Sequence, residues 1–232
     1  MNPVARGSIE RPLPGARLLE TEPSAESTRR QVVSAATLGT ELIIGGVRTV
    51  VVSVAQIAAR VFVSEPRLGS TRLVAVDGPG GAGKSTLAAS LAAVCGAQVV
   101  HTDDFAAENN QLAWWPRLEQ QVLEPIAGGR SGRYQRYDWV DRALAEWHEV
   151  TPGGVIVLEG VSSARAAVRD RLSFAVWVET PAAVRLARGL DRDGVHTLPL
   201  WEQWMATEDT HFAADRTREH VDLVVRGDIV GE

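Results

Sequence analysis

The residues with the clearest chemical meaning form a glycine-rich segment at 78–86, which reads Gly-Pro-Gly-Gly-Ala-Gly-Lys-Ser-Thr. It is a complete G-x-x-x-x-G-K-[ST] pattern, and the apolar run at 72–77 before it predicts a buried strand. Glycines lack a Cβ, so successive backbone N–H groups can converge on phosphate oxygens at the positive start of the next helix. We therefore expect a nucleoside triphosphate site formed by Gly78, Gly80, Gly81, Ala82, Gly83, Lys84, Ser85 and Thr86.

Two side chains of this segment have separate expected roles. Lys84 is expected to reach the β- and γ-phosphates with its ammonium group. Ser85 lies in the first turn of the following helix and is expected to bind Mg²⁺ through its hydroxyl, with Thr86 behind it. The expected cofactors are therefore ATP and Mg²⁺.

Acidic residues follow two further strand-like runs. Asp103 and Asp104 follow the run at 98–102, and Glu159 follows the run at 154–158. Asp103 is the expected base, which accepts a proton from an attacking hydroxyl and so contacts the substrate. Asp104 either helps to hold Mg²⁺ through water or caps the next helix. Glu159 is expected to orient metal-bound water or substrate, with a structural hydrogen bond as the alternative.

Three arginines follow the Thr-Pro pair at 180–181, which is typical of a helix start. Arg185, Arg188 and Arg192 are spaced by three and four residues, so a helix brings them close to one face. In a phosphoryl-transfer enzyme such a cluster closes over ATP and offsets charge on the transferred group, and Arg188 and Arg192 are the favoured catalytic candidates. The alternative is a solvated face that pairs with nearby aspartates.

The segment 134–139 reads Tyr-Gln-Arg-Tyr-Asp-Trp and is dense in aromatic and polar groups. We expect it to line a substrate pocket, where rings stack on a planar or sugar group and Arg136 or Asp138 bind hydroxyls. The competing interpretation is that such aromatic residues only anchor a long insert. That second role is the expected one for Trp114 and Trp115, while Trp201, Trp204, His211 and Phe212 are expected to pack the C-terminal helix onto the sheet.

These residues must be positioned by elements that alternate between strand and helix. Apolar strand-like runs occur at 73–77, 98–102, 154–158, 174–178 and 221–225, with helical segments between them. This rhythm predicts an α/β fold with a parallel five-stranded sheet flanked by helices, as in P-loop (phosphate-binding loop) nucleotide hydrolases. Ligands of such sheets gather at the carboxyl ends of the strands, so the glycine-rich segment and the acids are expected to meet there.

Composition indicates a single catalytic domain. The chain has 232 residues, of which 45% are hydrophobic, enough for one buried core. A net charge of −5 and the lack of a long Lys or Arg run argue against a nucleic-acid partner. The single cysteine, Cys95, has no partner for a disulfide or a zinc site and fits a core position in a reducing compartment. A cytoplasmic location is therefore expected.

We divide the chain into three segments. Residues 1–30, rich in Pro, Gly, Ser, Arg and Glu, are expected to be a disordered arm. Residues 31–70 are expected to be an apolar helical extension, because apolar residues between 47 and 61 recur at helical spacing. Charged residues interrupt this run, so it is not a membrane span. It either packs on the core or docks a partner, a membrane surface or a second copy, and residues 71–232 form the catalytic domain.

The residues resemble the uridine kinase and phosphoribulokinase-like branch of the P-loop kinases over roughly 73–225. Beside the segment 78–86, the resemblance rests on Thr-Asp-Asp-Phe at 102–105, where the branch has Asp-x-Phe-Tyr, and on Val-Leu-Glu-Gly at 157–160. It also rests on Tyr-Asp-Trp at 137–139, where uridine kinases have Tyr-Asp-Phe, and on the late strand-like run Val-Asp-Leu-Val-Val at 221–225.

The resemblance implies ATP-dependent phosphorylation of a hydroxyl group. It matches Asp103 to the base, Tyr137 to a ring that contacts the acceptor, and Arg188 with Arg192 to lid positions. The chain departs from the branch at Ala106, where a second aromatic residue is usual, and this bears on the substrate more than on the reaction. A nucleoside is the favoured small-molecule acceptor, since a phosphate-bearing acceptor would prefer Arg or Lys beside the base.

Other functions compete with this one. A kinase of a non-nucleoside alcohol, such as a sugar, a pantothenate-like or an antibiotic-like compound, uses the same parts. An ATP-hydrolysing switch is disfavoured, because the chain has no Asn-Lys-x-Asp element and no Leu-Ser-Gly-Gly-Gln signature. A regulatory nucleotide-binding module is the third alternative, and the presence of both Lys84 and Asp103 argues against it.

Overall fold

The computed structural model describes residues 40–44, 47–107, 110 and 112–227, with side chains described from residue 52 onward. The arm predicted at 1–30 lies outside the described residues. The described chain contains the expected five-stranded parallel sheet, in the order β4-β7-β3-β8-β9. Its strands are β3 (Arg72–Asp77), β4 (Gln98–His101), β7 (Val155–Glu159), β8 (Leu172–Glu179) and β9 (Leu223–Arg226). The predicted α/β fold is therefore confirmed.

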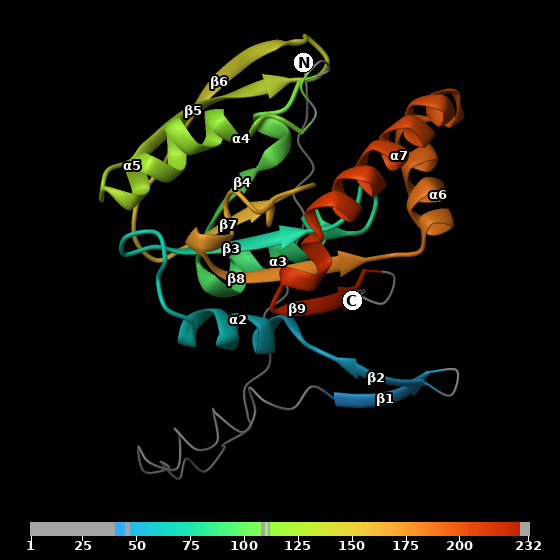
Figure 1. Cartoon of the computed structure of the whole chain (residues 1–232), viewed down its shortest axis with the longest axis horizontal. Coiled ribbons are helices and arrows are strands. Elements are labelled where there is room, and N and C mark those ends of the chain that lie inside the picture. The colour runs from blue at the N-terminus through green and yellow to red at the C-terminus, as the bar shows by residue number, and fades with distance from the viewer. Residues whose placement is uncertain (1–39, 45–46, 108–109, 111, 228–232) are drawn as a thin grey trace, which may run out of the picture. The chain divides into compact units, whose positions relative to one another are not determined.

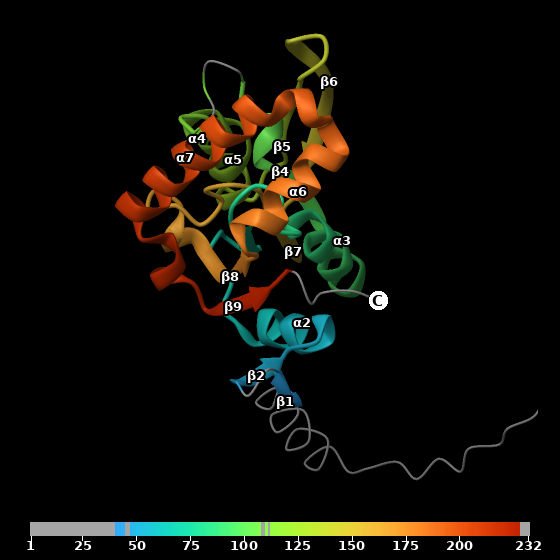
Figure 2. The same cartoon turned by 90° about the vertical axis from the view of Figure 1, so that its right-hand side faces the viewer.

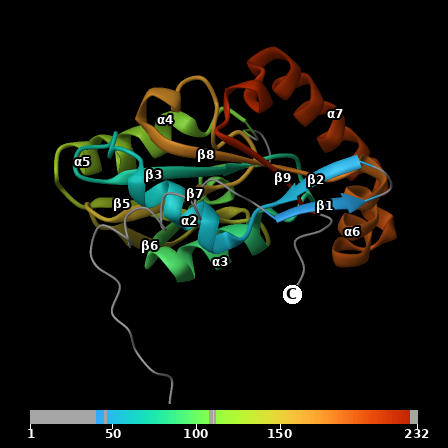
Figure 3. The same cartoon turned by 90° about the horizontal axis from the view of Figure 1, so that it is seen from below.

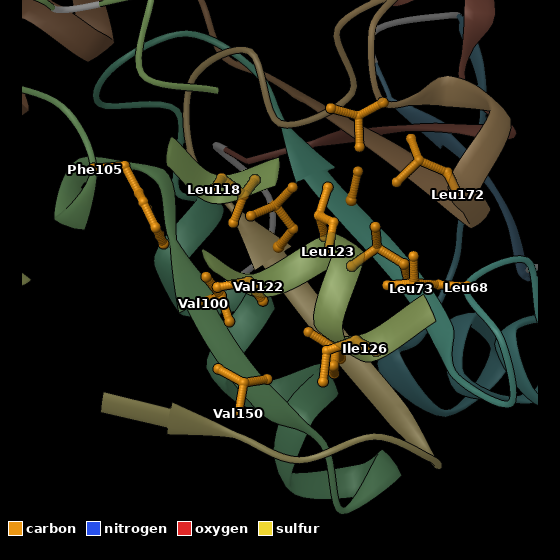
Figure 4. Close-up of a cluster of buried hydrophobic side chains, with 14 of the residues drawn as sticks. Leu68, Leu73, Val100, Phe105, Leu118, Val122, Leu123, Ile126, Val150 and Leu172 are labelled. Carbon is orange, nitrogen blue, oxygen red and sulfur yellow. The ribbon is translucent and has the colours of Figure 1, made fainter. Parts of the chain in front are cut away.

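Helices cover both faces of this sheet, because successive residues of its buried strands point to opposite sides. Val74 and Val76 of β3 face α2 (Val54–Val63) and α3 (Lys84–Cys95), which Figure 3 shows on this side of the sheet. Leu73 and Ala75 face the other side, where Leu118, Leu123 and Ile126 pack over the sheet (Figure 4). Those residues come from one irregular helical stretch formed by α4 (Trp115–Leu118), η2 (Glu119–Leu123) and α5 (Glu124–Ala127).

A helical hairpin stands at the carboxyl ends of the strands (Figures 1 and 2). It consists of α6 (Ala182–Asp193) and α7 (Leu198–Asp215), joined by the short turn η4 (Val195–Thr197). A separate antiparallel β-hairpin, β5 (Gly132–Asp138) and β6 (Ala143–Val150), follows α5, so the aromatic segment 134–139 is mostly strand. The remaining short turns are η1 (Thr102–Asp104), η3 (Arg169–Arg171) and η5 (Thr217–His220).

The extension at 31–70 is only partly helical in the described residues, which corrects the helical pattern expected from residue 47. Residues before the helix pair as the antiparallel strands β1 (Thr40–Ile44) and β2 (Val47–Val51). The Val and Thr residues of β2 are β-branched and favour a strand. The helix α2 starts only after Ser53, whose hydroxyl accepts from the Gln56 N–H at 3.2 Å while Gln56 accepts from the Ser53 N–H at 2.8 Å.

Ile57, Ala58 and Val61 of α2 are buried with residues of α3, so this helix packs on the core as expected. None of the helices in the described ranges combines the length and the apolar character needed to cross a membrane.

Candidate active site

The glycine-rich loop joins the end of β3 to the start of α3 and is fixed at its base by Asp77. This buried carboxylate accepts hydrogen bonds from the backbone N–H groups of Gly78 at 2.6 Å, Ser162 at 2.9 Å and Ala164 at 2.7 Å. Burial raises the pKa of Asp77 to about 7, against the effect of those donors and of nearby Lys84. Asp77 thus joins the loop to the segment that follows β7.

Glycine is required at two positions of the loop. Gly78 has φ +140°, and a Cβ there would lie 2.2 Å from the Val178 carbonyl oxygen. Gly81 has φ +76°, and its Cβ would lie 2.7 Å from the Arg185 carbonyl oxygen. Both the backbone conformation and the space therefore exclude a side chain at these two positions.

A cavity of about 370 Å³ at the carboxyl ends of the strands is lined by Gly80, Gly81 and Gly83 of this loop. The Lys84 side chain is buried at its edge, and its ammonium group donates to the Pro79 carbonyl oxygen at 3.0 Å. A backbone cradle, a lysine and a helix start fit the phosphates of a nucleoside triphosphate. Of the predicted residues, the cavity brings together Gly80, Gly81, Gly83, Lys84, Ser85, Thr86, Asp103, Glu159, Arg188 and Arg192.

Ser85 and Glu159 meet directly beside this cradle. The Ser85 hydroxyl donates to Glu159 Oε1 at 3.2 Å, while Glu159 Oε2 lies 2.7 Å from Nδ1 of His101, its register partner on β4. This hydrogen bond is the main cause that raises the pKa of His101. Within the described ranges no three or more His, Cys, Asp or Glu side chains gather as a metal site. A hydroxyl and a carboxylate are instead two oxygen donors of the kind that Mg²⁺ prefers.

Asp103 and Asp104 have opposite surroundings. Asp103 lines the cavity, where surrounding protein atoms desolvate its carboxyl and raise its pKa, while Lys84 lowers it. Asp104 is buried on the other side, and its Oδ2 accepts from the Tyr134 hydroxyl at 2.9 Å. Asp104 therefore does not lie with Ser85 and Glu159, and the expected metal-binding role has no support in its position.

The three arginines of α6 also separate. Arg188 and Arg192 line the cavity, and Arg188 lies within 3.4 Å of the carbonyl oxygens of Gly81 and Gly227. Arg192 pairs with Asp193 at 2.7 Å and lies over the ring of Trp201. Arg185 is buried, and its guanidinium donates to the backbone oxygens of Thr180 and Gly80. Arg185 thus supports the loop from behind, whereas the other two lie on the ligand side.

A second, smaller cavity adjoins the first on the side away from the loop. Both cavities share Asp103, Val161, Trp204 and Glu208, and the smaller one is further lined by Ala106, Leu112, Trp139 and Thr207. Trp139 donates its indole N–H to the Asp103 carbonyl oxygen at 3.2 Å. Its volume is about 50 Å³, and a group bound there would lie next to Asp103.

The predicted substrate residues on β5 do not line either cavity, which corrects their expected placement. Arg136 pairs with Glu146 at 2.7 Å and with Asp138 at 2.9 Å, and Asp138 also accepts the N–H groups of Val140 and Asp141. The ring of Tyr137 lies edge-on against Trp139. Arg136 and Asp138 thus stabilise the hairpin, and Tyr137 supports Trp139, which is the residue that reaches the cavity.

Comparisons with known proteins agree with this geometry. Residues 96–197 match the model of the phosphoribulokinase / uridine kinase family. A uridine kinase from Halobacterium salinarum is 25% identical over 181 residues, which cover 66% of this chain and 78% of that protein. Uridine kinase-like protein 5 from Arabidopsis thaliana is 33% identical over 75 residues, which cover 32% of this chain and only 16% of that protein.

A solved structure described as a possible uridine kinase from Bacillus stearothermophilus shares the fold. Its TM-score is 0.56 at 17% identity, and the match covers 74% of this chain and 96% of that one. The chain is similar to uridine kinases and phosphoribulokinases and has the fold of the P-loop kinases. This similarity supports a phosphotransferase with a nucleotide-binding fold, for which ATP is the donor that the family implies.

Sequence reasoning missed the contribution of α7 to the site. Trp201, Trp204 and Glu208 all line the nucleotide cavity, whereas the tryptophans were expected only to pack the helix onto the sheet. Trp201 packs against Gly189 of α6, where an added Cβ would lie 2.4 Å from its ring. Their spacing of three and four residues puts all three on one helix face. An acid on the same face as two tryptophans was the sequence feature that could have indicated a role in the site. Phe212 does pack on the sheet, against Trp177 of β8.

Proposed function

We propose that this kinase transfers the γ-phosphoryl group of ATP to a hydroxyl group of a small molecule, with a nucleoside as the favoured acceptor. The observation that carries the proposal is the position of Asp103. It lines the cavity of the phosphate loop together with Lys84, and it also lines the adjoining cavity that has aromatic walls. A base at this junction lies between a donor phosphate and an acceptor hydroxyl.

Each group of residues has one role in the proposed reaction. The loop N–H groups and Lys84 bind the phosphates, and Asp103 accepts the hydroxyl proton as the acceptor oxygen bonds to the γ-phosphorus and the bond to ADP breaks. Arg188 and Arg192 offset the charge on the transferred group. Ser85 and Glu159 would hold Mg²⁺, which neutralises phosphate charge when bound. The proposed setting is the cytoplasm, which keeps Cys95 reduced.

The proposal is tested by ATP consumption with purified protein and Mg²⁺ across nucleosides, sugars and pantothenate. Acceptor-dependent turnover with a nucleoside is the expected result, and turnover only with another alcohol would change the substrate class but keep the reaction. Hydrolysis at one slow rate, indifferent to every acceptor, would contradict phosphoryl transfer and favour a switch. Lys84→Ala is the matched inactive control.

A further inference from the structure

Glu208 of α7 lies where the two cavities of the site meet. It lines both of them, together with Asp103, Val161 and Trp204. A side chain at this junction is adjacent to the reacting groups, and Glu208 is the second carboxylate there besides Asp103. The mechanism above gives this second acid no role.

The contacts of Glu208 leave one carboxylate oxygen available. Oε2 accepts the Gly80 N–H at 2.9 Å and lies 3.7 Å from the Arg185 guanidinium. No hydrogen bond to Oε1 occurs within the described part of the chain. The side chain is 10% exposed, and burial raises its pKa, while the Gly80 N–H, Lys84 and Arg185 favour the charged form. One oxygen is thus fixed by the loop, which orients the other.

Burying a carboxylate costs desolvation free energy, so the position of Glu208 needs a reason other than packing. The helix α7 is already held to α6 by Trp201, which fills the space over Gly189 and donates its indole N–H to Asp193 at 3.0 Å. Buried acids with perturbed titration in a cleft are typical of functional sites. These facts favour a role for Glu208 toward a ligand.

The walls of the smaller cavity indicate the chemistry of that ligand. Trp139 and Trp204 lie edge to face with ring centroids 6.1 Å apart, beside the apolar side chains of Ala106, Leu112 and Val161. Among its described lining residues there is no Lys or Arg. An anionic acceptor would meet two carboxylates and no cation here, whereas an uncharged molecule with a flat apolar part and hydroxyl groups would match both features.

We propose that Glu208 selects acceptors with a second hydroxyl near the one that is phosphorylated, by accepting the hydrogen bond of that second hydroxyl on Oε1. The inference rests on the proposed function, since it takes the smaller cavity as the acceptor site and Asp103 as the base. For a nucleoside, the second hydroxyl belongs to the ribose. Glu208 and Asp103 together also disfavour nucleoside monophosphates as acceptors.

Glu208→Gln tests this role, because the amide oxygen still accepts the Gly80 N–H while an NH₂ group replaces the free oxygen. We expect the wild type to prefer uridine over its 2′-deoxy or 3′-deoxy analogue by about 10- to 100-fold in kcat/KM, the worth of one hydrogen bond to a charged group. In Glu208→Gln that preference is expected to fall severalfold, because the NH₂ group can only donate a weaker, neutral hydrogen bond to that hydroxyl, and the KM for ATP should stay unchanged. Glu202→Gln, an exposed position of the same helix, is the matched control.

The outcomes separate this inference from the proposed function. If uridine is phosphorylated and Glu208→Gln keeps the wild-type preference, the selecting role is wrong while the kinase function stands. A Glu208→Gln variant with tenfold weaker ATP binding would show that Glu208 only holds the phosphate loop, which also overturns the role.

If no compound is phosphorylated, the kinase function fails, and uridine binding is then followed by tryptophan fluorescence with a non-hydrolysable ATP analogue. A binding preference for uridine that Glu208→Gln lowers severalfold supports the role, and no preference in the wild type overturns it.

Discussion

Asp103 and Asp104 are adjacent in the chain, yet their surroundings give them different chemistry. Asp103 lines both cavities, whereas Asp104 is held by the hydroxyl of Tyr134 in the packed region below the hairpin. The direction of a side chain that follows a strand depends on hydrogen bonds and packing with residues that are distant in the sequence. A comparison of the two aspartates therefore tests the assignment of the base.

Asp103→Asn is expected to lower turnover by roughly 10²- to 10⁴-fold, the usual contribution of a positioned base, because an amide does not accept the hydroxyl proton. ATP binding should be largely kept, since the loop and Lys84 are untouched. Asp104→Asn is the control, and it should keep most of the turnover. Steady-state kinetics of both variants check this, and unchanged turnover in Asp103→Asn would remove Asp103 as the base.

Asp77 is expected to make the stability of the folded chain depend on pH. Its pKa is 3.8 when unfolded and about 7 when folded, so between these values the folded chain holds the proton more tightly. The stability that this group contributes is therefore greatest at low pH and falls as the pH rises toward 7. The free energy of unfolding of the wild type minus that of Asp77→Asn, measured with urea, should be lower at pH 8 than at pH 5. A difference that grows with pH would contradict the assignment.

At the scale of single residues, nine consecutive residues of the loop form a local pattern with one known geometry, so their phosphate-binding role can be predicted from the sequence and stays a prediction. Ser85 and Glu159 also lie together as expected, since Glu159 ends β7 and Ser85 follows the neighbouring strand β3 and its loop. Arg136 and Asp138 could not be placed from the sequence, because their partner Glu146 lies on the other strand of the hairpin. Their assigned roles depended on a pairing that only the folded chain shows.

The contact between α6 and α7 is the element that closes the site. Gly189→Ala would push a methyl group to 2.4 Å from the Trp201 ring, so we expect it to destabilise the fold by about 1–3 kcal/mol and to displace α7. The control Gly128→Ala has ordinary contacts of 3.4 Å or more and should have a much smaller effect. Chemical denaturation measures both, and equal stability of the two variants would contradict close packing at Gly189.

At the scale of elements, the five strands of the sheet were predictable, because each is a buried apolar run bounded by turn residues. The strand β2 was taken for helix because its apolar residues also fit a helical period. Its β-branched content and the Gly-Gly pair at 45–46 in the sequence, a typical hairpin signal, were the better guides. The hairpin of α6 and α7 was expected as helices, but its position over the site depends on Trp201 and Gly189.

For the whole molecule, ATP binding should be coupled to stability. A ligand that binds only the folded state stabilises it by about 2.7 kcal/mol at 100 times its Kd. We therefore expect Mg-ATP to raise the Tm of the wild type and to have little effect on Lys84→Ala. Thermal unfolding with and without Mg-ATP checks this, and an equal shift in both proteins would mean that the ligand binds elsewhere than the loop.

The position of the site was predictable at this scale, because parallel strands bring their carboxyl ends, and the residues after them, to one edge. The acceptor cavity was not, because it combines α7 with Trp139 and Val161 from two distant segments. Such a surface has no local sequence pattern. The chemistry of the acceptor is therefore indicated by Trp139, Trp204 and Glu208, and not by Tyr137 as the sequence suggests.

The central claim is that phosphate moves from ATP to a hydroxyl at the junction of the two cavities. The most direct test is to incubate the protein with Mg-ATP and uridine and to measure the mass of the products. The account predicts ADP and uridine that has gained one phosphate, with neither formed by Lys84→Ala. ADP formed with free phosphate, at a rate that uridine does not change and with no phosphorylated uridine, would contradict it.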